Sequence, residues 1–188
     1  MSTTASAERP RITLHMVASL DGFIAKPDNT VGWLSGAGGT YEPGVALSGE
    51  DAAAVLKSID CYVMGSRTYE HALELGWPYG DTPVAVMSRR EWQSARPGVE
   101  FHSGSINALL HALAPRFRNV WLVGGSQLAQ SFLVLGMVDE IILMIAPVVL
   151  GAGIRFFQDP LPESQWQLMD CTAYRDGFVE LTYKLRTT

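Results

Sequence analysis

The sequence predicts one α/β domain whose mostly parallel sheet ends in an antiparallel hairpin. Three short apolar runs, at residues 60–64, 84–87 and 120–123, each stop at glycine or hydroxyl residues, and two of them lead into residues at helical spacing. Strands that alternate with helices in this way favour a parallel sheet. Near the C-terminus, two further runs flank a turn at residues 175–177, which is typical of an antiparallel hairpin.

Length and charge limit the number of domains and the kinds of partner that the sequence allows. With 188 residues, 47% of them hydrophobic, the chain can form one domain with a substantial core but is too short for two. We expect a flexible N-terminus over residues 1–10 and a single domain over residues 11–188. The net charge of −5 argues against nucleic acid or an anionic membrane as the main partner.

Neither a metal site nor an export signal is predicted. Cys61 and Cys171 lie in apolar runs without metal-ligand spacing, so we expect them to be reduced residues of the core. The N-terminal residues lack the apolar segment of a signal peptide, and no run approaches the length of a membrane span. We therefore expect a cytoplasmic protein.

The first strand is expected over residues 11–18, followed by a turn and a short apolar run at residues 23–25. His15 is interpreted as a structural histidine, because no second ligand is spaced to join it. The long loop at residues 26–49 is rich in glycine, proline, asparagine and serine, and such loops are usually functional or mobile. Within it, Trp33 and Tyr41 could line a flat ligand, although covering the core is an alternative for at least one of them.

The next segments supply the first helices. Ser48 with an acid three residues later resembles a capping box that opens a helix over residues 51–58. Glu50 and Asp51 at this helix start either stabilise its dipole or act in catalysis. After the strand at residues 60–64, a second helix is expected to bury Tyr69, Ala72 and Leu73.

The remaining elements follow the same rules. A helix over residues 106–113 is predicted from its apolar spacing, and a long buried strand is predicted over residues 138–147. Ser126 occupies the expected N-cap of another helix, whose packed face includes Phe132 and Leu135. In total the pattern predicts about eight strands and four helices.

Three strand ends form the candidate site. Ligands of α/β sheets bind beyond the carboxyl ends of the parallel strands. Residues 65–68, 88–90 and 124–127 occupy such ends and provide two helix N-termini and three arginines. This combination suits a dinucleotide, because helix N-termini bind phosphates and guanidinium groups pair with them. The spacing is not the GxGxxG of the common dinucleotide fold.

The ordered set of motifs resembles the dihydrofolate reductase superfamily, in the branch similar to the reductase domain of the bifunctional riboflavin-biosynthesis deaminase/reductase. The resemblance covers residues 12 to about 183 and rests on segments 19–25, 64–70, 77–78, 87–89, 122–126, 138–140 and 147–153. It implies a mixed eight-stranded sheet flanked by about four helices, an NADPH-dependent activity and a homodimer.

The same resemblance assigns cofactor-binding residues. It places Val17, Ala18, Ile24 and Ala25 beside the nicotinamide, and Ser88 and Arg89 beside the 2′-phosphate, a role for which the strand-end pattern also offers Arg90. It places the pyrophosphate and adenosine against Gly65, Ser66, Arg67, Thr68, Gly124, Gly125, Ser126, Gln127 and Leu128. It also implies a cis peptide bond between the paired glycines.

Two departures from dihydrofolate reductases bear on the substrate. Those enzymes carry an acid on the helix after the mobile loop, where Glu50 and Asp51 are the only nearby acids here. They also carry an arginine before the third strand, where residues 80–83 contain none. A small heterocyclic or ribosylaminopyrimidine-like substrate is therefore expected in place of folate.

The functional hypothesis is an NADPH-dependent oxidoreductase that transfers hydride to this small molecule. Glu50, Asp51 or an ordered water would supply the proton, and Trp33 and Tyr41 would shape the substrate side. Two alternatives stay open: a non-catalytic dimeric protein that binds a nucleotide or flavin, and a true dihydrofolate reductase.

Overall fold

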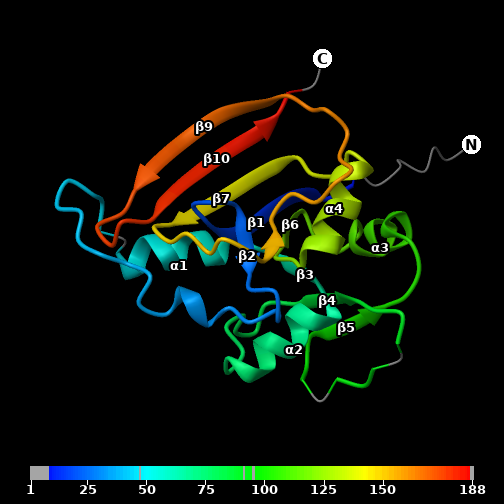
Figure 1. The fold of residues 1–188 in the computed structure, drawn as a ribbon. Helices are drawn as coiled ribbons and strands as arrows, with labels where there is room; N and C mark the ends of the chain where they lie inside the picture. Colours follow the sequence, from blue (N-terminus) through cyan, green and yellow to red (C-terminus); the bar gives the residue numbers. More distant parts are fainter. Residues whose placement is uncertain (1–8, 47, 91, 95, 187–188) are drawn as a thin grey trace, which may run out of the picture.

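An eight-stranded mixed sheet forms the centre of the molecule in the computed structural model, which describes residues 9–46, 48–90, 92–94 and 96–186 (Figure 1). In spatial order its strands are β5 (Val99–His102), β4 (Val84–Met87), β3 (Cys61–Gly65), β6 (Asn119–Leu122), β1 (Arg11–Ser19), β7 (Glu140–Ala146), β10 (Val179–Leu185) and β9 (Trp166–Ala173). The first six run parallel, and β10 pairs antiparallel with both β7 and β9. The predicted parallel sheet with an antiparallel C-terminal end is confirmed.

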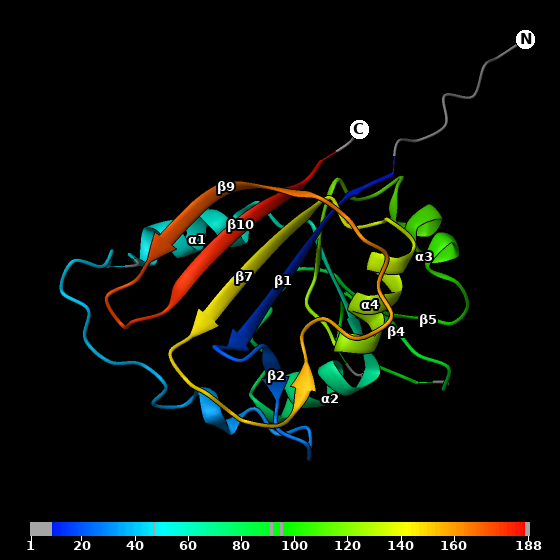
Figure 2. The same cartoon turned by 45° about the horizontal axis from the view of Figure 1, so that its top comes forward.

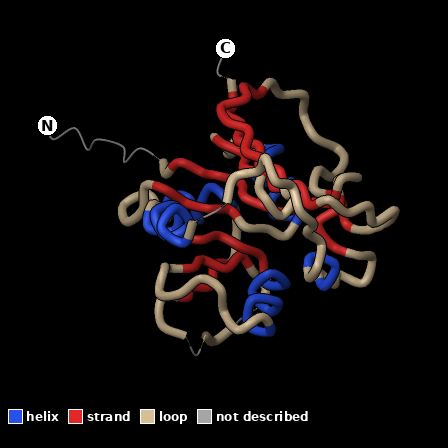
Figure 3. Tube along the Cα trace, turned by 90° about the vertical axis from the view of Figure 1, so that its left-hand side faces the viewer, coloured by secondary structure: helices blue, strands red, loops and turns tan. Residues whose placement is uncertain are grey.

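Helices lie on both sides of this sheet (Figure 3). The four α-helices are α1 (Gly49–Lys57), α2 (Ser66–Glu74), α3 (Ile106–Leu113) and α4 (Ser126–Val134). Helices α3 and α4 cover one face, where Leu14, Leu122 and Phe132 are fully buried in the main core. Helix α2 covers part of the opposite face and forms a second cluster with Tyr62 and Met64. No helix of the described chain has both the length and the apolar character that crossing a bilayer requires.

A separate two-stranded sheet raises the number of strands to ten. It pairs β2 (Phe23–Ala25) antiparallel with β8 (Ile154–Arg155), beside the carboxyl end of β1 (Figure 2). Asp21 joins the two segments, because its carboxylate accepts hydrogen bonds from the Ser19 hydroxyl at 2.6 Å and from the Leu150 and Gly151 N–H groups at 3.0 and 2.7 Å. The pKa of Asp21 is lowered to about 2, first by the serine hydrogen bond and then by these N–H groups.

The long loop before α1 is tied to the C-terminal hairpin. It contains a short 3-10 helix, η1 (Gly32–Leu34), and then runs beside the hairpin tip. The N–H groups of Gly39, Tyr41 and Val45 each donate to a hairpin carbonyl at 2.8 Å. Gly44 faces the hairpin so closely that a Cβ there would lie 2.5 Å from the carbonyl carbon of Tyr174. This pairing fixes the path of the loop.

Several local predictions were wrong. Helix α1 begins at Gly49, and the N-cap of α4 is Gly125, with Ser126 as its first residue. Leu73 is exposed because α2 covers only a narrow strip of the sheet, and Leu135 is exposed because it lies at the C-cap of α4. Cys171 is exposed on β9, because no helix of the described chain covers that side of the strand. Cys61 is buried as expected, and burial raises its pKa to about 12.

Candidate cofactor and substrate site

A cavity of about 1450 Å³ lies at the carboxyl ends of the central parallel strands and continues over the face of the sheet that carries α2. Its lining includes all of the predicted strand ends 65–68 and 88–90, and residues 125–127 of the predicted end 124–127. The strand order β4-β3-β6-β1 makes these ends neighbours. The topology therefore brings together segments that are far apart in the sequence.

Two helix N-termini open into this cavity. Helix α2 starts after Gly65 and helix α4 after Gly125, and neither N-cap provides a side-chain hydrogen bond. The first N–H groups of a helix have no intrahelical partner, and this end of the dipole is positive, so both starts can bind an anion. The Gly65 N–H donates to the Gly124 carbonyl at 2.8 Å and joins the two turns. The Gly124–Gly125 bond is cis, as the resemblance implied.

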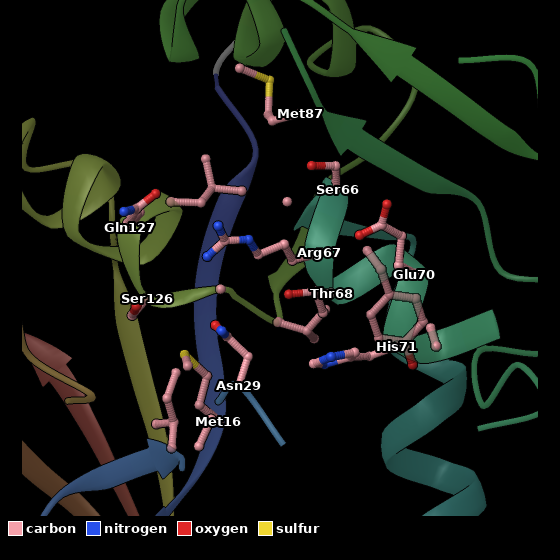
Figure 4. Close-up of a pocket in the computed structure, with 18 of the residues that line it drawn as sticks. Met16, Asn29, Ser66, Arg67, Thr68, Glu70, His71, Met87, Ser126 and Gln127 are labelled. Carbon is pink, nitrogen blue, oxygen red and sulfur yellow. The ribbon is translucent and has the colours of Figure 1, made fainter. Parts of the chain in front are cut away.

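Three arginines supply positive charge at this end. Arg67, Arg89 and Arg90 line the cavity. The Ser88 hydroxyl stabilises the turn at residues 88–90 by accepting a hydrogen bond from the Arg90 N–H at 3.0 Å. Figure 4 shows Ser66 and Thr68 on one side, Ser126 and Gln127 on the other, and Arg67 extending between them. The Ser126 hydroxyl also accepts a hydrogen bond from the Gln158 side chain at 2.7 Å. Helix starts and guanidinium groups are together the donor set that a dinucleotide with several phosphates requires.

An apolar end adjoins the phosphate-binding end. Val17, Ile24 and Ala25 line the cavity there, which fits a nicotinamide ring. Ala18 is buried on the other face of β1, and Gly124 is not part of the lining. A Cβ on Gly124 would meet the Met16 side chain at 3.5 Å, and the φ of Gly124 is +112°, a conformation that favours glycine. The residues present thus fit an NADPH-like cofactor in charge, polarity and available space.

Beyond this region the cavity has an aromatic floor, made of His15, Tyr62, Tyr79 and Trp121. The His15 and Trp121 ring centroids are 4.6 Å apart, and those of Tyr62 and Tyr79 are also 4.6 Å apart. Burial lowers the pKa of His15 to about 4. Burial also raises the pKa of Tyr62 and, with the charge of Tyr62 as a smaller cause, that of Tyr79 to about 12. These three groups are therefore uncharged at neutral pH.

The sequence did not assign the aromatic floor to the site. Tyr62 and Trp121 belong to apolar runs that were interpreted as buried strands, and His15 was interpreted as structural. Alternation along each strand places all three on one face, but a single sequence does not show that this face stays partly uncovered.

The structure does not bring every predicted site residue to the cavity. Glu50 is exposed on α1 and does not line it, and the Asp51 side chain lies outside the described part of the structure. Trp33 is only 8% exposed, and Tyr41 is 46% exposed beside the hairpin; neither lines the cavity. Among the described lining residues, Glu70 of α2 is the only carboxylate. A catalytic role for Glu50 or Asp51 and a substrate role for Trp33 or Tyr41 stay predictions.

Comparison with known proteins places the chain in a family. Residues 10–179 match the model of the RibD C-terminal domain. The chain therefore belongs to the RibD C-terminal domain family, as its motifs had indicated. Among the described residues, no three or more histidine, cysteine, aspartate or glutamate side chains lie close enough together to hold a metal ion.

Two curated relatives illustrate the range of this family. YwjB of Bacillus subtilis, which is described as uncharacterized, is 30% identical over 165 residues, covering 84% of this chain and 88% of YwjB. The riboflavin biosynthesis protein RibD of Corynebacterium ammoniagenes is 28% identical over 169 residues, covering 81% of this chain and 48% of RibD.

Solved structures agree with the fold. A Shewanella sp. PV-4 protein, provisionally described as a riboflavin biosynthesis protein, superposes with a TM-score of 0.79 at 23% identity, covering 94% of this chain and 99% of that protein. Dihydrofolate reductase from Enterococcus faecalis, solved in complex with NADP(H), gives a TM-score of 0.64 at 17% identity, with coverages of 94% and 97%. The predicted dihydrofolate reductase-like fold is confirmed.

Proposed function

We propose that this protein is an oxidoreductase that uses NADPH to reduce a small heterocyclic or ribosylaminopyrimidine-like compound. One observation carries the proposal: two helix N-termini without side-chain caps open into a single cavity that three arginines also line. Membership of the RibD C-terminal domain family supports the reductase activity. The NADP(H) complex of the structurally similar dihydrofolate reductase supports the choice of cofactor.

The chain's own residues would divide the work along the cavity. The turns at residues 65–68 and 125–128 would hold the pyrophosphate, and Ser88, Arg89 and Arg90 would hold the 2′-phosphate. Val17, Ile24 and Ala25 would orient the nicotinamide and exclude water from it. When bound, NADPH would supply the hydride. The link between β2 and β8 through Asp21 would keep Ile24 and Ala25 in place.

The product also needs a proton. Glu50 lies outside the cavity, which argues against direct transfer from its carboxyl group. We therefore propose an ordered water, or the Asp51 side chain, as the proton source. A water-mediated route is compatible with a cavity that is open to solvent at its mouth.

The cofactor proposal is tested by calorimetric titration with NADPH, NADH and FMN in parallel. NADPH should bind well ahead of NADH, and Arg89→Ala should remove that preference by weakening NADPH about tenfold or more while leaving NADH nearly unchanged. Arg186→Ala removes an exposed arginine outside the cavity and is the matched control. Equal losses for both nucleotides would overturn the assignment of Arg89.

The same titration separates the alternatives. Preference for FMN, or tight NADPH binding without oxidation by any acceptor, would favour a non-catalytic nucleotide- or flavin-binding protein. Turnover of dihydrofolate with inhibition by methotrexate-like compounds would favour a true dihydrofolate reductase. Failure to bind any of the three nucleotides would reject the reductase proposal.

We also propose that the protein forms a homodimer through β9 and β10. Leu168 and Cys171 are exposed on the core side of β9, opposite Tyr183 and Leu181 of β10. No helix of the described chain covers this side of the hairpin (Figure 2). An apolar surface without charges can pair with a second copy of itself. Leu168→Glu should give a monomer in sedimentation velocity, whereas Gln167→Glu, on the opposite face, should not.

A further inference from the structure

Building on the proposed function, we propose that the hydride acceptor is a neutral, planar nitrogen heterocycle without a phosphate group, bound against the aromatic floor. The acceptor would take a hydride, one proton with two electrons, from NADPH at the carbon of a C=N bond. The adjacent nitrogen would take a proton from water, and NADP⁺ would be released. The proposal thus excludes a phosphorylated acceptor, which the proposed function leaves open.

The aromatic floor offers its stacking area at His15, Tyr79 and Trp121, which are half-buried, whereas Tyr62 is only 4% exposed. Tyr62 and Trp121 are directly opposite each other on the neighbouring strands β3 and β6. The His15 ring lies 4.6 Å from that of Trp121 at an interplanar angle of 33°, and the Tyr79 ring lies 4.6 Å from that of Tyr62 at an interplanar angle of 51°. Planar rings stack on such surfaces through their faces, with little dependence on their substituents.

The walls above the floor are apolar and open. Leu56 of α1 is 52% exposed and Leu75 at the end of α2 is 69% exposed, and both line the cavity. Val31, Leu34 and Pro78 complete this part of the lining. Two exposed leucines from different helices at one cavity form an apolar surface of the kind that marks ligand-binding grooves.

Positive charge is confined to the other end of the cavity. Among the described lining residues, the only arginines or lysines are Arg67, Arg89 and Arg90, which follow the ends of β3 and β4. Figure 4 shows the Arg67 side chain directed toward Gln127, between the two helix starts. The bound cofactor's own phosphates would occupy this end.

A phosphate on the acceptor would therefore lack an arginine or lysine partner. His15, Tyr62 and Tyr79 are uncharged at neutral pH, and Glu70 adds a negative charge on the α2 side. His71 of α2 is the other histidine among the described lining residues. Burying a phosphate against leucine and tyrosine costs free energy, since no arginine or lysine lies there to replace its water. A neutral ring avoids this cost.

The test compares ligands that share one ring system and differ in one phosphate. The protein is first saturated with NADP⁺, which fills the arginine end, and is then titrated calorimetrically with 5-amino-6-ribosylaminouracil and with its 5′-phosphate. Lumazine serves as a neutral bicyclic ring without a sugar. The neutral compounds should bind at least tenfold more tightly than the phosphate. Equal or tighter binding of the phosphate would overturn the proposal, as would failure of both neutral compounds to bind.

A variant that adds a positive charge to the cavity wall tests the role of charge while the ring of the ligand stays the same. Leu75→Lys places an ammonium at the cavity wall at a highly exposed position, so the fold should tolerate it. It should improve binding of the phosphorylated ligand at least fivefold without changing NADP⁺ binding. Leu73→Lys, on the same helix but outside the lining, is the matched control. If Leu75→Lys leaves phosphate binding unchanged, the absence of charge at this wall does not determine specificity.

The NADP⁺ titration that precedes these measurements distinguishes failure of the proposed function from failure of the inference about the acceptor. Failure of NADP⁺ and NADPH to bind would reject the proposed function itself. Normal cofactor binding with a preference for the phosphorylated acceptor would reject only the inference about the acceptor.

Discussion

Replacing His15 by glutamine should make the stability of the protein less dependent on pH. Burial lowers the pKa of His15 from 6.5 to about 4, so the folded protein holds this ring neutral while the unfolded chain binds a proton below about pH 6.5. Keeping His15 neutral therefore costs the folded protein no stability above pH 6.5, and the cost grows as the pH falls toward 4. Glutamine is neutral throughout and removes this term.

The size of the effect follows from linkage. A folded pKa of about 4 and an unfolded pKa of 6.5 correspond to a loss of about 2 kcal/mol between about pH 8 and about pH 5. The variant also loses the ring contact with Trp121, which costs about 1 kcal/mol at every pH. The variant should thus be less stable than the wild type at pH 8 but should lose less stability on acidification.

Urea unfolding followed by circular dichroism at both pH values measures the two free energies of unfolding for each protein. His111→Gln, which replaces an exposed histidine of α3, is the control and should keep the dependence of the wild type. If His15→Gln loses as much stability as the wild type between the two pH values, His15 is not held neutral by burial.

Three further predictions concern the scaffold around the site. Asp21→Asn should lower the melting temperature at pH 7. The lowered pKa of the Asp21 carboxylate stabilises the fold above pH 3.8, and this stability is lost as the pH falls toward about 2, so wild type and variant should have similar melting temperatures at low pH. Phe132→Ala should cost about 3–5 kcal/mol in urea unfolding, whereas Leu135→Ala at an exposed position should cost less than about 1 kcal/mol. Gly44→Ala should release the loop from the hairpin and speed its cleavage in limited proteolysis, whereas Gly39→Ala, with open space around its Cβ, should not.

The sequence was informative about the phosphate-binding end of the cavity because that end depends on local patterns. Each strand that stops at a glycine or serine before a helix creates a helix N-terminus at a predictable residue. Parallel pairing then places the segments at 65–68, 88–90 and 124–127 at one edge of the sheet, where the structure shows all of them except Gly124 lining one cavity. Local signals and the topology rule were sufficient here.

The substrate end was not predictable because it depends on contacts between distant segments. Tyr41 lies in a loop whose path is set by hydrogen bonds to the C-terminal hairpin, more than a hundred residues later in the chain. Trp33 is buried by the turn of η1, and its neighbours reach the cavity instead. Neither outcome has a signature in composition or periodicity. Whether an aromatic residue covers the core or lines a ligand site is decided by which elements pack above it.

The two faces of the sheet divide stability and function between them. On the face under α3 and α4, Ile12, Leu14 and Phe132 are fully buried and form the main core. On the other face, Val55 and Leu56 of α1 are exposed, so α1 does not seal the strands beneath the cavity as a core helix would. A sealed face would bury more apolar surface and stabilise the fold, but it would leave no room for a second molecule beside the cofactor. Incomplete cover on this face is therefore what we expect of a site that must hold two ligands side by side.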